Sequence, residues 1–445
     1  MLRSWWMLLI IIITIGFFSH SETVPNGYDN DAVSIALNAE CIRQTGQDEY
    51  GVKSPLFFRS LDDYKAPLYF YLTSALFSIT GPKLYAMKFF SMVLGFLSLV
   101  IFLLWLKKDQ EIAPVLSSER FAFWLFLFAL TPWFLVTQRL PQGTSLVFVF
   151  SSLQILCAYE MIKNKSTLGS LGHGLLVGLG VYAYHNQKIL FFGQYFILFV
   201  LLFWFKNERS KTKFILISLM MAIFIASPFL WDLLHERQMI ERYSNVKSST
   251  SPVFWLVKSF LNYFRHFNLS NFFIRGDLNL RHHHGFGGML PLTLLPFLLV
   301  GIVHGARKLI NQESFFWGYA FLLLLFSFVP GAITFEGLPH SLRTNCALFP
   351  LFLFSLYGAT QIKTPWSKIM NLFVSISLIV FLFSISYYFR SYPEESTKYW
   401  NAPHTLLKEK LTQPDEIAPT NHSYLTIMDR WVHVSRHKDY RYCSI

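Results

Sequence analysis

Long apolar stretches alternate with short polar segments along most of the chain. The first stretch extends from Trp5 to Phe18, and others follow near residues 85–106, 120–137, 145–162, 168–185, 189–206, 212–232, 289–306, 315–333, 343–361 and 367–388. Roughly 20 residues cross the hydrocarbon core of a bilayer as a helix. The pattern therefore predicts an all-α integral membrane protein with about eleven transmembrane helices.

One further apolar stretch, residues 67–80, is shorter, and the positive charges indicate whether it crosses the membrane. If it does not cross, five basic loops lie on the same side as Arg3, namely residues 107–119, 163–167, 207–213, 307–314 and 362–368. Cytoplasmic loops carry an excess of Lys and Arg. We therefore expect residues 67–80 to lie along or dip into the outer interface, with the N-terminus cytoplasmic and the C-terminus outside.

This topology collects most of the polar chemistry on the outer face. The outer segments are a first loop at 20–84 with interfacial helices, a turn at 138–144, a long loop at 233–288 and a turn at 334–342. A short outer tail, residues 390–445, follows a transmembrane domain of residues 1–389.

Composition agrees with a membrane protein and argues against nucleic-acid binding. Apolar residues make up 53% of the chain and charged residues 14%, whereas soluble domains have about 25% charged residues. The net charge of +12 comes from basic residues in short loops, which is the membrane pattern rather than a nucleic-acid surface.

Cys41 and Cys443 both fall in segments that we expect on the outer face. A disulfide between them is therefore possible, but the sequence alone does not show it.

The first outer loop contains the acidic candidates. Asp29 and Asp31 follow an Asn-Gly turn and precede a helical stretch, so Asp31 has two readings that can coexist. It is a good helix N-cap residue, and a carboxylate in a membrane-facing cleft can also take a proton from an acceptor hydroxyl. Lys65 precedes the short apolar stretch, where a lysine either pairs with a lipid phosphate or extends along the membrane surface.

The other outer segments contribute basic candidates. Arg139 is the only charged residue of its turn, against the positive-inside trend, and a phosphate partner would explain it. Arg281 begins a basic run that continues with the histidines 282–284, although adjacent histidines rarely converge on one metal ion. His340 and Arg343 lie in and beside the last outer turn.

Several of these segments together resemble the C-type membrane glycosyltransferases, in particular the bacterial relatives of the dolichyl-phosphate-mannose–protein mannosyltransferases and the lipid A aminoarabinose transferases. The resemblance rests on Thr45–Gly51, Asp63–Tyr69, Thr131–Trp133 with Arg139, Gly276–His282 and Pro339–Arg343. These matches occur in order between about residues 20 and 360.

The resemblance implies a bacterial plasma-membrane (inner-membrane) enzyme. It would transfer a sugar from a polyprenyl-phosphate donor, with inversion, to a hydroxyl or similar acceptor on the outer face. Asp31 matches the catalytic aspartate and Lys65 the phosphate-binding lysine, while Arg139 and Arg343 match positions that line the donor site. Arg281, His282 and His340 lie in the matched motifs and are expected to bind substrate.

Two departures from the family pattern keep other readings open. The chain has Ala32 and Gln142 where the family usually has carboxylates, and hard divalent cations need oxygen ligands. A divalent metal is therefore only an open expectation, and Asp29 is a candidate to replace the missing carboxylate. A non-catalytic member that binds lipid-linked sugar, or a transporter, are the alternatives. The sugar and the acceptor are not identified by the sequence.

Overall fold

The computed structural model describes residues 5–60, 63–235, 251–335, 337–362, 366–403, 423–437 and 443. Residues 236–250 of the expected long outer loop and residues 404–422 of the expected tail lie outside the described residues, as does Lys363 of the last basic loop.

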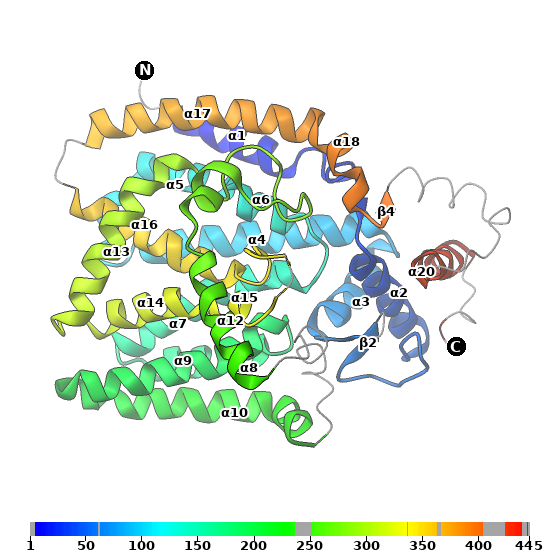
Figure 1. Cartoon of the computed structure of the whole chain (residues 1–445), viewed down its shortest axis with the longest axis horizontal. Coiled ribbons are helices and arrows are strands. Elements are labelled where there is room, and N and C mark those ends of the chain that lie inside the picture. Colours follow the sequence, from blue (N-terminus) through cyan, green and yellow to red (C-terminus); the bar gives the residue numbers. More distant parts are fainter. Residues whose placement is uncertain are drawn as a thin grey trace.

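Most of the helices run lengthwise through the molecule and form a stack several helices deep (Figure 1). These are α1 (Trp5–Phe18), α4 (Leu84–Leu106), α5 (Ser118–Ala129), α6 (Pro132–Gln138), α7 (Gly143–Ile162), α8 (Thr167–Gly180), α9 (His185–Trp204), α10 (Thr212–His235), α13 (Leu295–Ile310), α14 (Phe315–Phe326), α15 (Val329–Ala332), α16 (Leu348–Gln361) and α17 (Trp366–Arg390). Their apolar side chains form one large buried core.

A second, smaller group of elements gathers at one end of this stack, on the right in Figure 1. It comprises α2 (Asn30–Thr45), α3 (Leu68–Thr80), α18 (Tyr392–Ser396), α20 (Ser423–Val432), and the strands β1 (Gly27–Tyr28), β2 (Phe58–Ser60), β3 (Asp63–Lys65) and β4 (Ala402–Pro403). Both strand pairs, β1 with β4 and β2 with β3, are antiparallel. The longer helix α12 (Pro252–Arg265) crosses the front of the stack.

Short 3-10 or π-helical turns complete the described elements. They are η1 (Ala113–Val115), η2 (Lys206–Lys211), η4 (Asn271–Arg275), η5 (Leu292–Leu294), η6 (Asn345–Ala347), η7 (Thr397–Tyr399) and η8 (His433–His437). Two of them, η4 and η7, border the polar cavity described below.

The expected count of eleven transmembrane helices is not confirmed. Among the described residues, six helices are long and apolar enough to cross a membrane, or seven if the bent pair α5 and α6 forms one span. That pair bends by 62° because Pro132, at the start of α6, lacks the backbone N–H that would continue α5. Helices α8 and α16 coincide with two of the expected transmembrane stretches, but each has only 14 residues and is too short to be counted as a span.

Four of the basic loops meet at the end of the stack opposite α2 and α3. Lys163 forms an ion pair with Asp109 at 3.0 Å, joining the loops that follow α4 and α7. The Trp204 indole donates to the Leu309 carbonyl at 3.1 Å, and the Trp317 indole donates to Glu111 at 2.7 Å. The cytoplasmic assignment of this end remains a prediction.

Glycines allow the closest helix crossings. A β-carbon on Gly301 of α13 would lie 1.9 Å from the Phe354 carbonyl oxygen of α16, and one on Gly358 would lie 1.8 Å from the Phe297 carbonyl oxygen. Gly174 of α8 meets α10 in the same way, 2.2 Å from the Ser218 carbonyl oxygen. Such small residues let membrane helices pack backbone to backbone, where apolar surface alone drives no association.

The short apolar stretch and the tail pack on α2. The stretch 67–80 contains the 13-residue helix α3, which is shorter than a membrane span and lies against α2. Helix α20 packs on the same helix, and Arg430 donates to the Glu49 carboxylate at 2.9 Å in a buried ion pair. A disulfide joins Cys41 to Cys443, as the sequence allowed. Cys443 is therefore tied to α2.

Candidate active site

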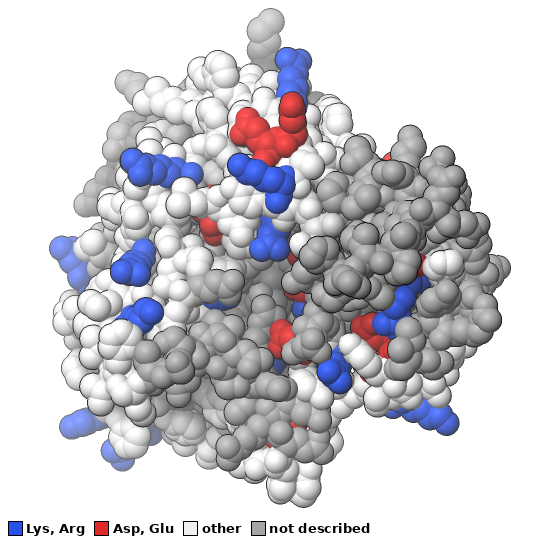
Figure 2. Space-filling model, turned by 45° about the vertical axis from the view of Figure 1, so that its right-hand side comes forward, with Lys and Arg blue, Asp and Glu red and all other residues white. Residues whose placement is uncertain are grey.

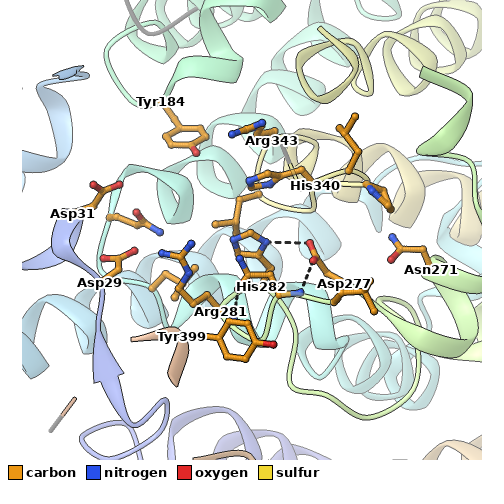
Figure 3. Close-up of a pocket in the computed structure, with 18 residues that line it drawn as sticks. Asp29, Asp31, Tyr184, Asn271, Asp277, Arg281, His282, His340, Arg343 and Tyr399 are labelled. Atoms are coloured by element: carbon orange, nitrogen blue, oxygen red, sulfur yellow. Dashed lines mark hydrogen bonds and ion pairs between the residues drawn. The ribbon is translucent and has the colours of Figure 1, made fainter. Parts of the chain in front are cut away.

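A polar cavity of about 450 Å³ lies at the end of the stack that carries α2. Six of the eight candidate residues line it: Asp29, Asp31, Arg281, His282, His340 and Arg343. Figure 3 shows the two aspartates on one side, the histidines and Arg343 on the other, and Arg281 between them. Figure 2, which turns this end forward, shows acidic and basic side chains interspersed on it. The structure thus brings segments near residues 30, 280 and 340 together.

Asp29, not Asp31, caps helix α2, so the capping role expected for Asp31 was wrong. The Asp29 side chain accepts a hydrogen bond of 2.8 Å from the Ala32 amide, and its extended backbone precedes the first helical residue. Asp31 lies in the first turn and is about one-third exposed. Asp31 also lines the cavity, so its carboxylate can reach a molecule there.

Lys65 contacts the cavity-lining residue Asp31 but does not itself line the cavity. Strand β3 pairs with β2 in a hairpin, and Lys65 at its end forms an ion pair with the Asp31 carboxylate. Lys65 does not line the cavity and is largely buried. The geometry makes it a partner that orients Asp31, and the phosphate-binding role implied by the resemblance remains a prediction.

The environment of Asp29 favours the protonated, neutral carboxyl group more than water does. Burial and the neighbouring charge of Asp31 raise the pKa of Asp29 to about 6, although the Ala32 amide, Arg281 and Lys65 oppose the shift. Two carboxylates side by side resist simultaneous ionisation. The pair therefore changes charge close to neutral pH, where an acid–base group is most useful.

Asp277 anchors the opposite wall of the cavity. Its carboxylate accepts hydrogen bonds from the Ser341 amide at 3.1 Å, the Ser341 hydroxyl at 2.8 Å and the Asn279 amide at 2.9 Å. It also accepts a hydrogen bond from His282 Nδ1 at 3.1 Å, and the His282 ring stacks on His340 with 4.6 Å between centroids. One buried carboxylate therefore holds both basic segments in place (Figure 3).

The remaining two histidines of the triplet stabilise the loop and do not line the cavity. The His283 ring bonds to the Gly288 carbonyl at 3.4 Å and to the Gly285 amide at 3.0 Å. His284 Nε2 bonds to the Ser384 hydroxyl of α17 at 2.8 Å. Burial lowers the pKa of His283 to about 4, so it is neutral at physiological pH.

Arg139 does not line the cavity, contrary to the position that the resemblance implied. Its guanidinium is fully buried and donates to the carbonyls of Phe17 at 2.7 Å, Ser19 at 2.9 Å and Val24 at 3.1 Å. It also lies over the Tyr388 ring, 5.3 Å from the centroid. Arg139 thus holds the chain just after α1, because helix C-termini leave carbonyls without intrahelical donors.

The cavity also contains residues that the sequence did not single out. Asp277 lies inside the segment Gly276–His282, but a lone aspartate in a loop gives no local signal of its function. Tyr184, Asn271 and Tyr399 line the cavity from three further segments. Aromatic rings and side-chain amides suit a sugar, since they combine an apolar face with hydrogen-bonding groups.

The described residues do not fit a metal site held by the protein alone. Among the residues that the structure describes, no group of three or more His, Cys, Asp or Glu side chains is arranged to hold an ion. The Asp29–Asp31 pair is already balanced by Lys65 and by Arg281, which Figure 3 shows pointing toward the aspartates. We derive no step through a metal.

A small pocket of about 10 Å³ shares lining residues with both the polar cavity and an apolar one. It shares Asn271, Pro339 and His340 with the polar cavity. It shares Phe272 and Phe328 with an apolar cavity of about 300 Å³ bordered by η4, α13 and α14. A polar head and an apolar chain of one molecule can thus occupy adjoining spaces.

Comparisons with known proteins agree with this architecture. No protein-family model and no curated protein matches the sequence. Among solved structures, the oligosaccharyltransferase of Archaeoglobus fulgidus superposes with a TM-score of 0.55 at 14% identity, over 96% of this chain and 60% of its own. The same enzyme tethered to an acceptor peptide gives a TM-score of 0.53 at 14% identity, with 96% and 59% coverage.

A bacterial structure also matches. ArnT from Cupriavidus metallidurans, bound to undecaprenyl phosphate, superposes with a TM-score of 0.51 at 10% identity, over 97% of this chain and 70% of its own. This chain spans about 60% of the length of the archaeal enzyme, so the likeness covers the part that the two share. At these identities the likeness shows the fold, and the chain has the fold of the C-type membrane glycosyltransferases.

Proposed function

We propose that this protein is a membrane glycosyltransferase that moves a sugar from a polyprenyl-phosphate donor to a hydroxyl or similar acceptor at the outer face. The observation that carries the proposal is the division of charge in one cavity. Asp29 and Asp31 lie on one side, and Arg281, Arg343 and His282 provide basic groups that can face a phosphate.

This division suits a displacement at the anomeric carbon. The acceptor oxygen forms a bond to that carbon while the bond from carbon to phosphate oxygen breaks, and its electron pair stays on the phosphate. Asp31 takes the proton of the acceptor hydroxyl, and the basic groups stabilise the negative phosphate as it leaves. Fixed charges placed where charge develops are a major source of catalysis.

The donor's lipid chain has a place beside the site. The apolar cavity behind Phe272 and Phe328 lies near the polar cavity, since the small pocket shares lining residues with both. The ArnT structure of similar fold holds undecaprenyl phosphate, which supports a lipid phosphate as the ligand here. The donor sugar and the acceptor are left to experiment.

The proposal can be tested with purified protein in liposomes. The liposomes are supplied with radiolabelled sugars on undecaprenyl phosphate as donors and with extracts of membrane lipid or protein as acceptors. We expect label to move to an acceptor and free undecaprenyl phosphate to appear in equal amount. Binding of the donor without either product would instead support a non-catalytic lipid-sugar binding protein. Movement of intact donor across the liposome membrane, without cleavage, would support a transporter.

A further inference from the structure

The Asp277 carboxylate accepts hydrogen bonds from two backbone amides, from the Ser341 hydroxyl and from His282 Nδ1. Burial alone would raise its pKa, but hydrogen bonding and charge from His282, with the Asn279 and Ser341 amides, hold the pKa of Asp277 well below its ordinary value. Asp277 is therefore ionised across the physiological pH range. The negative charge lies directly beside one nitrogen of His282.

This contact defines the orientation of His282. Because Nδ1 donates to Asp277, the tautomer is set, and Nε2 is the ring nitrogen left to interact with a molecule in the cavity. The stacked ring of His340 prevents rotation from the other side. Burial and the nearby charges of His282 and Arg343 lower the pKa of His340 well below its ordinary value, so His340 is a neutral neighbour.

The other charged groups around His282 are arranged on both sides of the cavity. Arg281 and Arg343 add positive charge that attracts a phosphate, and Asp29 and Asp31 lie across the cavity. His266 reaches the same wall by accepting from the His340 amide at 3.4 Å. Asp277 is thus the negative group in direct contact with His282.

We propose that Asp277 is a positioning residue that holds His282 as the proton donor to the leaving lipid phosphate. This inference rests on the proposed glycosyl transfer and deepens it. As the bond from the anomeric carbon to the phosphate oxygen breaks, protonated His282 gives its Nε2 proton to a phosphate oxygen. Asp31 takes the acceptor's proton, and exchange with water restores both groups. The lipid leaves as its phosphate monoester.

The experiment compares three single variants, Asp277→Asn, His282→Gln and Ser341→Ala, and the double variant of Asp277→Asn with His282→Gln, in liposomes with the same labelled donor. Ser341→Ala removes one hydrogen bond from Asp277 but keeps its contact with His282, so it is the matched control for damage to the loop. For each variant we measure kcat and KM for the donor between pH 5 and 9, and the melting temperature.

We expect Asp277→Asn to lower kcat about 100-fold with little change in KM, since general acid catalysis contributes about 100- to 10,000-fold. On the alkaline side of the pH profile, the activity of Asp277→Asn should also begin to fall at a lower pH than that of the wild type. Ser341→Ala should keep the alkaline limb of the wild type. His282→Gln should lower kcat as much as Asp277→Asn, and the double variant should add little to either, because the two residues act as one unit.

Several results would overturn the inference. One such result is that Asp277→Asn loses activity equally at all pH values, that Ser341→Ala loses as much, and that the melting temperature falls in both. Asp277 would then have only a structural role. If Asp277→Asn does not fold, His282→Gln with a wild-type alkaline limb would also refute the inference. A wild-type protein without any transfer would refute the proposed function itself, which the variants alone cannot do.

Discussion

Lys65 forms an ion pair with the Asp31 carboxylate, although 34 positions separate the two residues in the chain. The β2–β3 hairpin carries Lys65 to the first turn of α2, and Lys65 is largely buried while Asp31 keeps access to the cavity. The pair therefore fixes the direction of the carboxylate that is the best candidate for the general base.

A Lys65→Gln variant should lower kcat rather than affinity. Displacing a reacting group by about 1 Å can cost about 100-fold in rate, and we expect a loss of that order with KM for the donor nearly unchanged. Steady-state kinetics in liposomes provide the measurement. A large rise in KM with kcat preserved would show instead that Lys65 binds the donor phosphate.

Asp31→Asn and Asp29→Asn separate catalysis from helix capping. Asp31→Asn keeps the side-chain size but removes the basic group, so transfer should fall by about 100- to 10,000-fold. Because Asp29 and not Asp31 accepts from the Ala32 amide, folding should be unaffected. Asp29→Asn should also fold, since asparagine caps helices about as well as aspartate. Full activity of Asp31→Asn at normal protein level would remove Asp31 from the mechanism.

The raised pKa of Asp29 predicts a dependence on pH. The pKa moves from 3.8 to about 6, so the side chain loses its proton as the pH rises through about 6. If the charged pair is the active form, the rate should rise over that interval, and Asp29→Asn should remove that acid limb. The raised pKa favours the folded state at low pH, and this contribution is lost as the pH approaches 6. A wild-type rate that is flat between pH 4.5 and 7 would contradict the assignment.

Arg139→Gln tests whether this arginine binds substrate or holds the backbone. The substitution leaves the carbonyls of Phe17, Ser19 and Val24 without their donor. An unsatisfied buried group costs about 1–3 kcal/mol, so we expect a clear fall in melting temperature in detergent. Binding of undecaprenyl phosphate by the folded fraction should be normal. Weaker binding with unchanged stability would support the donor-site role that the resemblance implied.

Reduction of the Cys41–Cys443 disulfide should loosen the attachment of α20. Cys443→Ser should lower the melting temperature, since loss of a native disulfide typically costs about 2–5 kcal/mol. Cys157→Ser is the matched control, because Cys157 forms no disulfide. Mass spectrometry after maleimide labelling measures the pairing. Labelling of Cys41 in unreduced protein would contradict it, and an intact disulfide would place this end in an oxidising compartment.

The helical membrane architecture and the segments that line the cavity could be predicted from the sequence alone. Apolar runs and basic loops are local properties, and burial in lipid acts on each run separately, so they can be found without tertiary contacts. Motifs with Asp29, Arg281 and Arg343 could be singled out for the same reason, because polar groups in outer segments stand out against an apolar chain.

Which of these groups meet, and what each of them contacts, depends on how the helices pack in three dimensions. Arg139 stood out by the same charge signal as Arg343, but it is buried among carbonyls of the segment that follows α1, whereas Arg343 lines the cavity. Asp277 carried no signal, because its value lies in contacts with His282 and with Ser341, 64 positions away. Hydrogen bonds and ion pairs between distant segments depend on distances of about 3 Å that only the packed helices set.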